Sequence, residues 1–227
     1  MYARHLCLLA KLFLSSKTLH DEVHTFFFYV LTENCDAGAR IVGYFSKEKN
    51  PSKNNNLSCL LTLPSSQKSG YGKLLIDMSY ALSRVERRVG GPEHPVSDLG
   101  LAAYRAYWRA AIQAYLRSLR DGNAHSVNIK SVSLATRIHP TDVVNQLLAD
   151  GMLLYKDGVY YIKAEVQGGS KWSGCHTDAR YDQKARRFGA HAIRRRASPQ
   201  RHEASRKMSW NVVRDDLKKV SYKIQKT

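Results

Sequence analysis

The first third of the chain carries short apolar runs that are rich in aromatic and β-branched residues. Residues 25–32 (TFFFYVLT) and 39–46 (ARIVGYFS) have the composition of buried strands. A polar turn separates them, which predicts a hairpin. Residues 57–63 (LSCLLTL) predict a third strand that ends at Pro64. Ahead of these strands, apolar and basic residues alternate at helical spacing over residues 5–19, which predicts a short helix.

Helical spacing replaces the strand pattern after residue 70. Leu75, Met78 and Leu82 belong to an apolar series with a period near 3.6, so we expect a helix over residues 72–88. A loop with two glycines and two prolines follows. Ser97 and Asp98 are good N-cap residues for the next helix.

A third pattern begins at residue 127. Short helices are predicted at 131–136 and 140–150, the second with a proline near its start and Gly151 just beyond its end. Residues 152–156 and 159–163 predict strands around Asp157-Gly158, a strong hairpin signal. The order helix, helix, hairpin resembles a winged helix. Beyond Gly168 the periodicity fades and the composition indicates disorder, except over residues 210–220.

The net charge of +17 is concentrated at the C-terminal end, where residues 168–227 hold 16 Lys and Arg against 5 Asp and Glu. Such a segment suits polyanions such as nucleic acid, although a solvated tail has the same composition. No run of 18 apolar residues and no signal-peptide pattern is present, so we expect an intracellular protein without a membrane span. The four cysteines, Cys7, Cys35, Cys59 and Cys175, are far apart and form no CxxC pair, which argues against zinc and disulfides.

The most informative unit is a strand, a loop and a helix, LSCLLTLP-SSQKSGYGKLLIDMSYALS. Its loop, Gln67 to Gly72, places two glycines at the start of a helix, where backbone N–H groups and the helix dipole attract phosphate oxygens. The loop is neither a P-loop nor a dinucleotide-binding fingerprint. By itself this motif is weak and is more typical of a tight turn without a ligand.

Longer stretches of the sequence decide between a phosphate-binding loop and a tight turn without a ligand. LCLLAKLFL, FFYVLTE, IVGYFSKEKN, GYGKLLID and PEHPVSDLGLAAYRAYW, in this order, resemble the catalytic core of the MYST family of histone acetyltransferases, over residues 2–166. The resemblance implies an α+β fold, with a GNAT-like acyl-CoA acyltransferase core and a C-terminal winged-helix-like segment. It divides the chain into an acetyltransferase domain at 1–166 (core 1–122, winged-helix-like segment 123–166) and a basic tail at 167–227.

The resemblance also implies the activity and its residues. The chain would be a lysine acetyltransferase that moves an acetyl group from acetyl-CoA to histone lysines. The loop from Gln67 would hold the coenzyme A diphosphate, and the preceding strand would line the acetyl and pantetheine arm. Lys68 departs from the family's arginine, so it keeps the charge but loses the bidentate geometry. The residues assigned to the cofactor are Leu60, Leu61, Thr62, Leu63, Gln67, Lys68, Ser69, Gly70, Tyr71, Gly72, Lys73 and Ser97.

Glu93, between Pro92 and Pro95, matches the family's catalytic glutamate. A lysine side chain has a reference pKa of about 10.4, so it must lose a proton before it attacks a thioester. Cys59 matches the family's active-site cysteine. It is either a nucleophile that briefly holds the acetyl group or a small residue that lines the acetyl pocket, and we favour direct transfer. Lys17 aligns with the family's self-acetylated lysine, with Ser15-Ser16 in place of the usual flanking pair.

The expected partners are histone tails and nucleosomes, scaffold subunits of an acetyltransferase complex, and DNA through the basic tail, in the nucleus. The family's Cys/Cys/His/Cys zinc finger lies upstream of LCLLAKLFL, so we expect no metal site here. An alternative is a truncated, catalytically impaired homologue that binds chromatin or nucleic acid, and a small-amine acetyltransferase is a more remote one. We do not expect the winged-helix-like segment to read DNA, because its second helix, TDVVNQLLAD, carries no Lys or Arg.

Overall fold

The structure is a computed structural model that divides into two units. One comprises Met1–Met78 with Ala190–Thr227, and the other comprises Ser79–Gly189. No described helix has both the length and the hydrophobicity needed to cross a bilayer. The structure describes residues 2–14, 23–35, 38–51, 53–121, 127–156, 159–162, 207–213 and 220–222.

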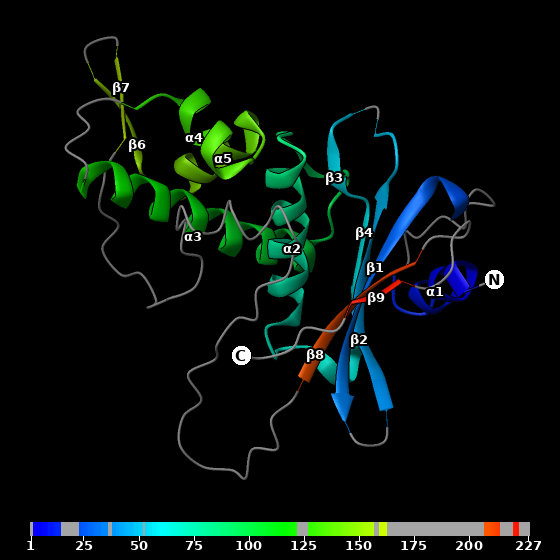
Figure 1. Cartoon of the computed structure of the whole chain (residues 1–227). Coiled ribbons are helices and arrows are strands. Elements are labelled where there is room, and N and C mark those ends of the chain that lie inside the picture. Colours follow the sequence, from blue (N-terminus) through cyan, green and yellow to red (C-terminus); the bar gives the residue numbers. More distant parts are fainter. Residues whose placement is uncertain are drawn as a thin grey trace, which may run out of the picture. The chain divides into compact units, whose positions relative to one another are not determined.

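The first unit is built on an antiparallel hairpin of β1 (Phe26–Cys35) and β2 (Gly38–Glu48), as the sequence predicted. The two strands pair from Phe26 opposite Glu48 to Cys35 opposite Gly38, with a shift in register between Leu31 and Thr32. Figure 1 shows this hairpin within a five-stranded sheet of order β4-β2-β1-β8-β9.

One face of this sheet is covered by α1 (Tyr2–Lys11). The helix buries Leu6 and Cys7 against sheet residues that include Tyr44, and the Tyr44 hydroxyl donates a hydrogen bond of 2.8 Å to the Leu6 carbonyl. The expected helix over residues 5–19 is therefore shorter and starts earlier. It ends in a basic residue, Lys11, whose charge suits a helix C-terminus, and the following residues form a turn.

The expected third strand is interrupted at Ser58. It forms β3 (Asn55–Leu57) and β4 (Cys59–Thr62), and β4 pairs antiparallel with β2. At the break, the Ser58 N–H bonds the Ser46 carbonyl at 2.8 Å while the Cys59 N–H bonds the Ser46 hydroxyl at 3.2 Å. Two consecutive backbone N–H groups thus donate hydrogen bonds to the same residue, Ser46. A regular antiparallel ladder does not allow this.

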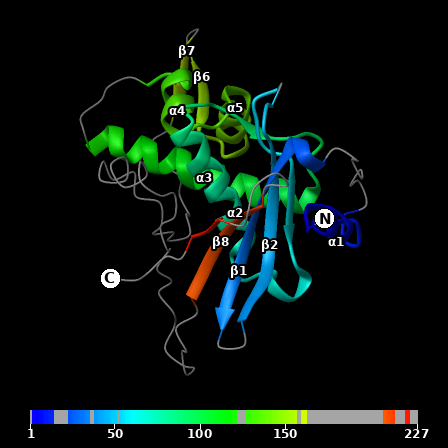
Figure 2. The same ribbon diagram turned by 45° about the vertical axis from the view of Figure 1, so that its right-hand side comes forward.

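Two strands lie in the part of the chain for which the composition indicated disorder. β8 (Lys207–Val213) pairs antiparallel with β1, with Trp210 opposite Leu31, and β9 (Val220–Tyr222) pairs with β8. Figure 2 shows β8 alongside β1. Residues 210–220 are the range that the sequence analysis excepts from disorder, and both strands overlap it. Without β8, the second edge of β1 would present unpaired N–H and C=O groups, and β8 supplies their partners.

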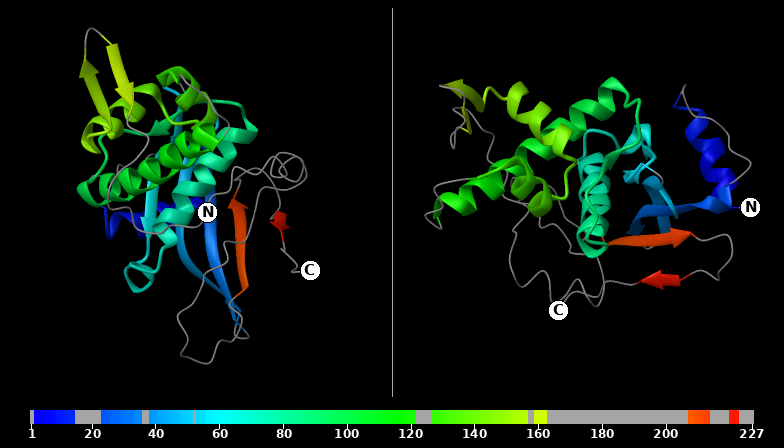
Figure 3. Two further views of the ribbon diagram at one scale, coloured as in Figure 1. Left: turned by 90° about the vertical axis from the view of Figure 1, so that its left-hand side faces the viewer. Right: turned by 90° about the horizontal axis from the view of Figure 1, so that it is seen from above.

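The second unit is helical at its centre. α3 (Asp98–Asp121), α4 (Ile129–Thr136) and α5 (Pro140–Ala149) pack on one another, and β6 (Leu153–Lys156) pairs with β7 (Val159–Ile162) in a hairpin (Figure 3). The predicted order helix, helix, hairpin is confirmed. The remaining short elements are η1 (Val23–Thr25), η2 (Pro64–Ser66) and β5 (Gly91–Pro92).

Aromatic residues form the core of the second unit. The boundary between the units falls within α2 (Tyr71–Val85), so that Tyr80 of this helix belongs to the second unit. The Tyr80 ring stacks on Tyr107 of α3 with 4.9 Å between centroids, and the Trp108 indole N–H donates to the Tyr80 hydroxyl at 2.7 Å. Tyr80 is fully buried, so this bond satisfies a hydroxyl that would otherwise be costly to bury.

The helix ends follow the predicted caps. The Ser97 hydroxyl accepts the Gly100 N–H at 3.2 Å, as an N-cap does. α5 has Pro140 in its first turn, and Gly151, with φ of 61°, follows its last turn. Asn128, which the sequence did not single out, caps α4 by accepting the Ser131 N–H at 2.7 Å. With an antiparallel sheet and separate helices, the α+β class is confirmed.

Replacing Gly43 with alanine will destabilise the chain. A Cβ there would lie 2.5 Å from the Leu61 carbonyl oxygen and 3.2 Å from the Thr62 Cα, so the β2–β4 pairing must shift. We expect a loss of about 1–3 kcal/mol in the free energy of unfolding, measured with urea. Gly72→Ala is the matched control, because its Cβ would meet only the Thr62 hydroxyl at 3.4 Å. Equal stability of the two variants would contradict the expectation.

Candidate active site

The candidate residues fall in both units. Cys59 and all the cofactor candidates from Leu60 to Lys73 belong to the first unit, where one strand, one loop and one helix end hold them. Glu93 and Ser97 belong to the second unit. Lys17 lies outside the described residues.

β4 is an edge strand whose side chains alternate between two environments. Cys59 and Leu61 are buried in the cluster beneath α1, while Leu60 and Thr62 are half-buried on the opposite face. Because β4 ends the order of its sheet, only one of its two edges pairs with β2. Backbone groups on the other edge can therefore bond a ligand that runs along the strand.

The Cys59 thiol lies in a buried cluster with two other polar groups, the Tyr44 hydroxyl and the Cys7 thiol. Burial raises the pKa of Tyr44, and both thiols and a hydrogen bond with Cys59 raise it further. The Tyr44 proton is directed to the Leu6 carbonyl, so the phenol presents its oxygen lone pairs to the remaining neighbours. Cys59 itself is buried among apolar residues of this cluster, which are the surroundings of a packing residue.

The loop between β4 and α2 has the backbone expected of a phosphate-binding turn. Lys68 has φ of 58° and Gly70 has φ of 86°, so left-handed residues alternate just before the helix starts. Such alternation can direct successive N–H groups to one side of a loop. The Gln67 side-chain amide donates to the Thr62 carbonyl at 3.2 Å and ties the loop to the end of β4. The exposed Lys68 side chain adds a positive charge at this point.

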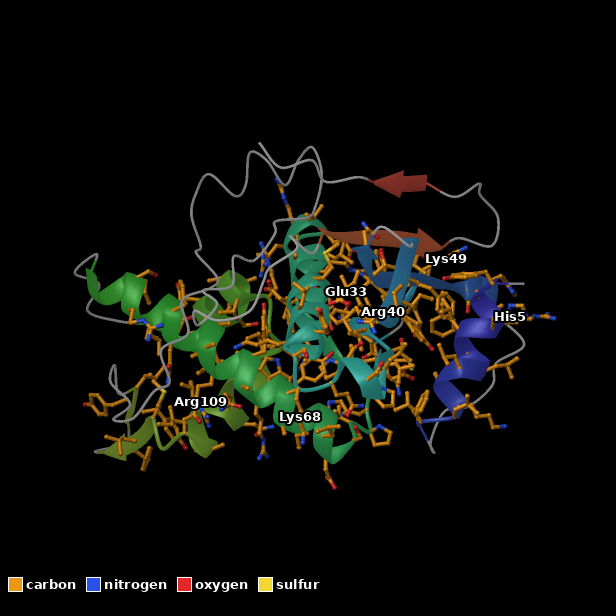
Figure 4. All side chains as sticks on the ribbon, turned by 90° about the horizontal axis from the view of Figure 1, so that it is seen from below. His5, Glu33, Arg40, Lys49, Lys68 and Arg109 are labelled. Atoms are coloured by element: carbon orange, nitrogen blue, oxygen red, sulfur yellow. The ribbon has the colours of Figure 1, made fainter. Side chains whose placement is uncertain are left out.

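A buried carboxylate anchors the first residue of α2. Glu33 of β1 is 8% exposed and accepts a hydrogen bond from the Tyr71 hydroxyl. Its other oxygen pairs with the Arg40 guanidinium at 2.5 Å, and Figure 4 shows Glu33 and Arg40 close together. Tyr71 lies between the two loop glycines, so the position of the loop depends on a strand residue 38 positions earlier. The sequence analysis missed both Glu33 and Arg40.

Lys73 lies in the first turn of α2, next to the candidate phosphate-binding loop. Burial lowers the pKa of Lys73, while Asp77, four residues later on the same helix, raises it in part. A half-buried lysine at the positive end of a helix already has unfavourable surroundings for its charge. An anion bound at this helix end would relieve them.

Glu93 has an exposed side chain and follows directly after β5 (Gly91–Pro92). It lies in a loop between α2 and α3, and Ser97 at the end of this loop caps α3. The structure thus places the candidate base on backbone fixed at both ends. Among the described residues no group of three or more His, Cys, Asp or Glu is arranged to hold a metal.

The edge strand of an antiparallel sheet leads here into a glycine-containing loop at the start of a helix. This arrangement defines an α+β protein with a candidate binding site for a phosphate-bearing ligand. The chain belongs to the MOZ/SAS family, whose model matches residues 1–187. This match confirms the resemblance stated above. It continues past residue 166, where the sequence analysis placed the end of the domain.

Several characterised proteins are similar to this chain. Identity is 47% over 162 residues to the Histone acetyltransferase Tip60 homolog of Caenorhabditis elegans, covering 71% of this chain and 35% of that protein. It is 47% over 165 residues to the Histone acetyltransferase of the MYST family 2 of Arabidopsis thaliana, covering 73% and 36%. Mouse Histone acetyltransferase KAT6B is 46% identical over 162 residues, covering 71% and 8%. The chain therefore spans about a third of the first two relatives.

Tyr71→Phe will lower stability because it removes a donor from the buried Glu33 carboxylate. We expect a loss of about 1–3 kcal/mol in the free energy of urea unfolding. Tyr160→Phe is the matched control, since Tyr160 is 67% exposed and its ring contact with Tyr155 does not need the hydroxyl. This control should change stability by less than about 0.5 kcal/mol. If the two variants unfold at the same urea concentration, the Glu33–Tyr71 bond does not anchor the loop.

Proposed function

We propose that this chain is a lysine acetyltransferase that transfers the acetyl group of acetyl-CoA to lysine side chains of core histones. It would thereby regulate chromatin and transcription in the nucleus. The observation that carries the proposal is the family match over residues 1–187 together with relatives named histone acetyltransferases at 46–47% identity. An exposed carboxylate, Glu93, and a glycine-containing loop at a helix start, which this chemistry needs, support the proposal.

The first unit offers two features that fit coenzyme A. The unpaired edge of β4 would bond the amide-bearing pantetheine arm, with Leu60, Leu61, Thr62 and Leu63 along it. The loop N–H groups and the start of α2 would bond the diphosphate. The Gly72 position supports this, since the helix backbone carries no side chain there to block an approaching phosphate. The loop residues assigned to this role are Gln67, Lys68, Ser69, Gly70, Tyr71, Gly72 and Lys73, and Ser97 is proposed as a further contact.

Glu93 would act as the general base. A histone lysine arrives as an ammonium ion, and a carboxylate must take its proton, directly or through water, before the amine can attack. The amine nitrogen then bonds to the thioester carbonyl carbon, the carbon–sulfur bond breaks, and coenzyme A leaves as the thiolate. Pro92 and Pro95 flank Glu93-His94, and each proline fixes its own φ, which limits the freedom of the short segment that carries the carboxylate.

The finer assignments are part of the same proposal. The core would be GNAT-like over residues 1–122, and the helix–helix–hairpin at 123–166 would be winged-helix-like. The basic segment at 167–227 would contact DNA, and scaffold subunits would join the enzyme in a complex. Self-acetylation of Lys17 stays a prediction from the resemblance.

The central test is Glu93→Gln in the full chain, with labelled acetyl-CoA and histone octamers as substrates. The amide keeps the shape of the side chain but cannot accept the lysine proton, so we expect the rate to fall by about 10²–10⁴-fold while acetyl-CoA binding persists. Glu86→Gln, which alters another exposed glutamate, should keep the wild-type rate. A folded wild-type chain that neither binds acetyl-CoA nor modifies histones would sink the proposal.

Cys59→Ala will retain most of the turnover. Cys59 is 8% exposed and packs in the cluster beneath α1, which supports the proposal that it lines the acetyl pocket and does not carry the acetyl group. We expect a change of less than about threefold in kcat, together with a stability loss of about 1 kcal/mol for the deleted buried sulfur. Complete loss of turnover in a variant with wild-type circular dichroism would favour a covalent acetyl-cysteine intermediate instead.

A further inference from the structure

The loop that carries Glu93 is hydrogen-bonded at Gly90 to the linker between α4 and α5, within the second unit. The Gly90 N–H donates to the Arg137 carbonyl at 3.1 Å, and the Gly90 carbonyl accepts the His139 N–H at 3.0 Å. These bonds form a parallel bridge between Gly90 and Ile138. Both backbone polar groups of the residue three positions before Glu93 are therefore committed to the linker between α4 and α5.

This linker has little freedom of its own. Arg137 closes α4 in the left-handed region, with φ of 65°, and its N–H bonds the Ser133 carbonyl at 2.7 Å. The Ser133 hydroxyl donates to the Ile138 carbonyl at 2.6 Å, and the Ile138 side chain is completely buried. His139 then caps α5 by accepting the Thr141 N–H at 3.3 Å. The linker thus provides a rigid support for Gly90.

A buried carboxylate reaches the same loop from the first turn of α5. Asp142 is 9% exposed, and a Cβ placed on Gly91 would lie only 2.7 Å from its Oδ2 atom. The charged forms of His139, on its own helix, and His94, in the loop, both attract Asp142. From the other packed helices, the hydroxyls of Tyr80 (α2) and Tyr104 (α3) also lie within its electrostatic reach.

The carboxylate is retained at a cost. Burial is the largest influence on Asp142 and raises its pKa, while His139 and His94 lower it in part. For an acid with a raised pKa, the contribution to stability is present below its unfolded pKa, about 4, and is lost as the pH rises through the folded value. Asp142 therefore contributes less to the stability of the fold above this pH range than below it. Groups of this kind concentrate at functional sites.

We propose that Asp142 is a positioning residue for Glu93. Its Oδ2 atom lies in the space that a side chain on Gly91 would need, and His94 lies within its electrostatic reach. Because these residues stand on either side of Pro92-Glu93, the carboxylate faces the segment of the proposed base at both ends. The Arg137–His139 linker holds the same segment at Gly90. This inference rests on the proposed role of Glu93, and it assigns to the first turn of α5 a part in catalysis that needs no contact with substrate.

The test compares two buried polar residues on one face of α5. Gln146 lies one turn after Asp142, is 2% exposed, and its side-chain amide has no hydrogen-bond partner in the part of the chain that the structure describes. We expect Asp142→Ala to lower kcat at least tenfold with the KM for acetyl-CoA within about twofold, since misplacing a catalytic group by about 1 Å can cost 10²-fold. Gln146→Ala should lose stability but keep kcat. Asp142→Asn, which keeps the contact with Gly91, should recover part of the loss.

Hydrogen exchange of the full chain gives a readout that does not require activity. The amides of Gly90, Gly91, Glu93 and His94 should exchange about tenfold faster in Asp142→Ala and at the wild-type rate in Gln146→Ala. Equal kcat losses at positions 142 and 146, or unchanged exchange in the Asp142 variants, would overturn the inference. If the wild-type chain lacks activity, the proposed function fails while exchange still decides whether Asp142 holds the loop.

Discussion

The pairing of β2 with β4 is the constraint on which the candidate cofactor site depends. Opposite Thr62, the β2 strand has Gly43, and only a residue without a side chain leaves room there for the Leu61 carbonyl. This close approach fixes the end of β4, and the Leu63 N–H extends the contact with a 3.0 Å bond to the Val42 carbonyl. The chain then turns at Pro64 into the loop, so the position of the loop glycines follows from the ladder before them.

Two buried carboxylates play similar parts in the two units. Glu33 holds Tyr71 within the candidate phosphate loop, and Asp142 lies against Gly91 before the candidate base. Each acts on a glycine-containing segment. Ordering a glycine backbone costs more conformational entropy than ordering that of other residues, so such a segment needs contacts that hold it. In each case a residue of a regular element restricts an irregular one. Burying a charge for this purpose costs stability, which is acceptable where geometry determines the reaction rate.

The elements of the fold could largely be predicted because periodicity is a local property of the sequence. The hairpin at β1 and β2, the helix α2 and the caps at Ser97 and Pro140 all follow from residues within one or two turns. The break at Ser58 could not be predicted, since it depends on Ser46 in another strand. The same holds for β8, whose pairing with β1 joins segments about 180 residues apart.

The candidate site could likewise be predicted only where it depends on local sequence. The motifs around Gly70 and Glu93 are contiguous strings, so the sequence revealed them. Glu33, Tyr44 and Asp142 were missed because no local motif marks them. Only the fold shows what each one faces.

The position of Asp142 also bears on what the helix–helix–hairpin is for. α5 contains no Lys or Arg, and its inner face carries Asp142 and Gln146 among apolar residues. A helix that reads a DNA groove needs cations and donors on its outer face, and this helix has no cation there. The linker before it bonds Gly90 on both sides. The segment is therefore better explained as a support for the loop that carries Glu93, the proposed base.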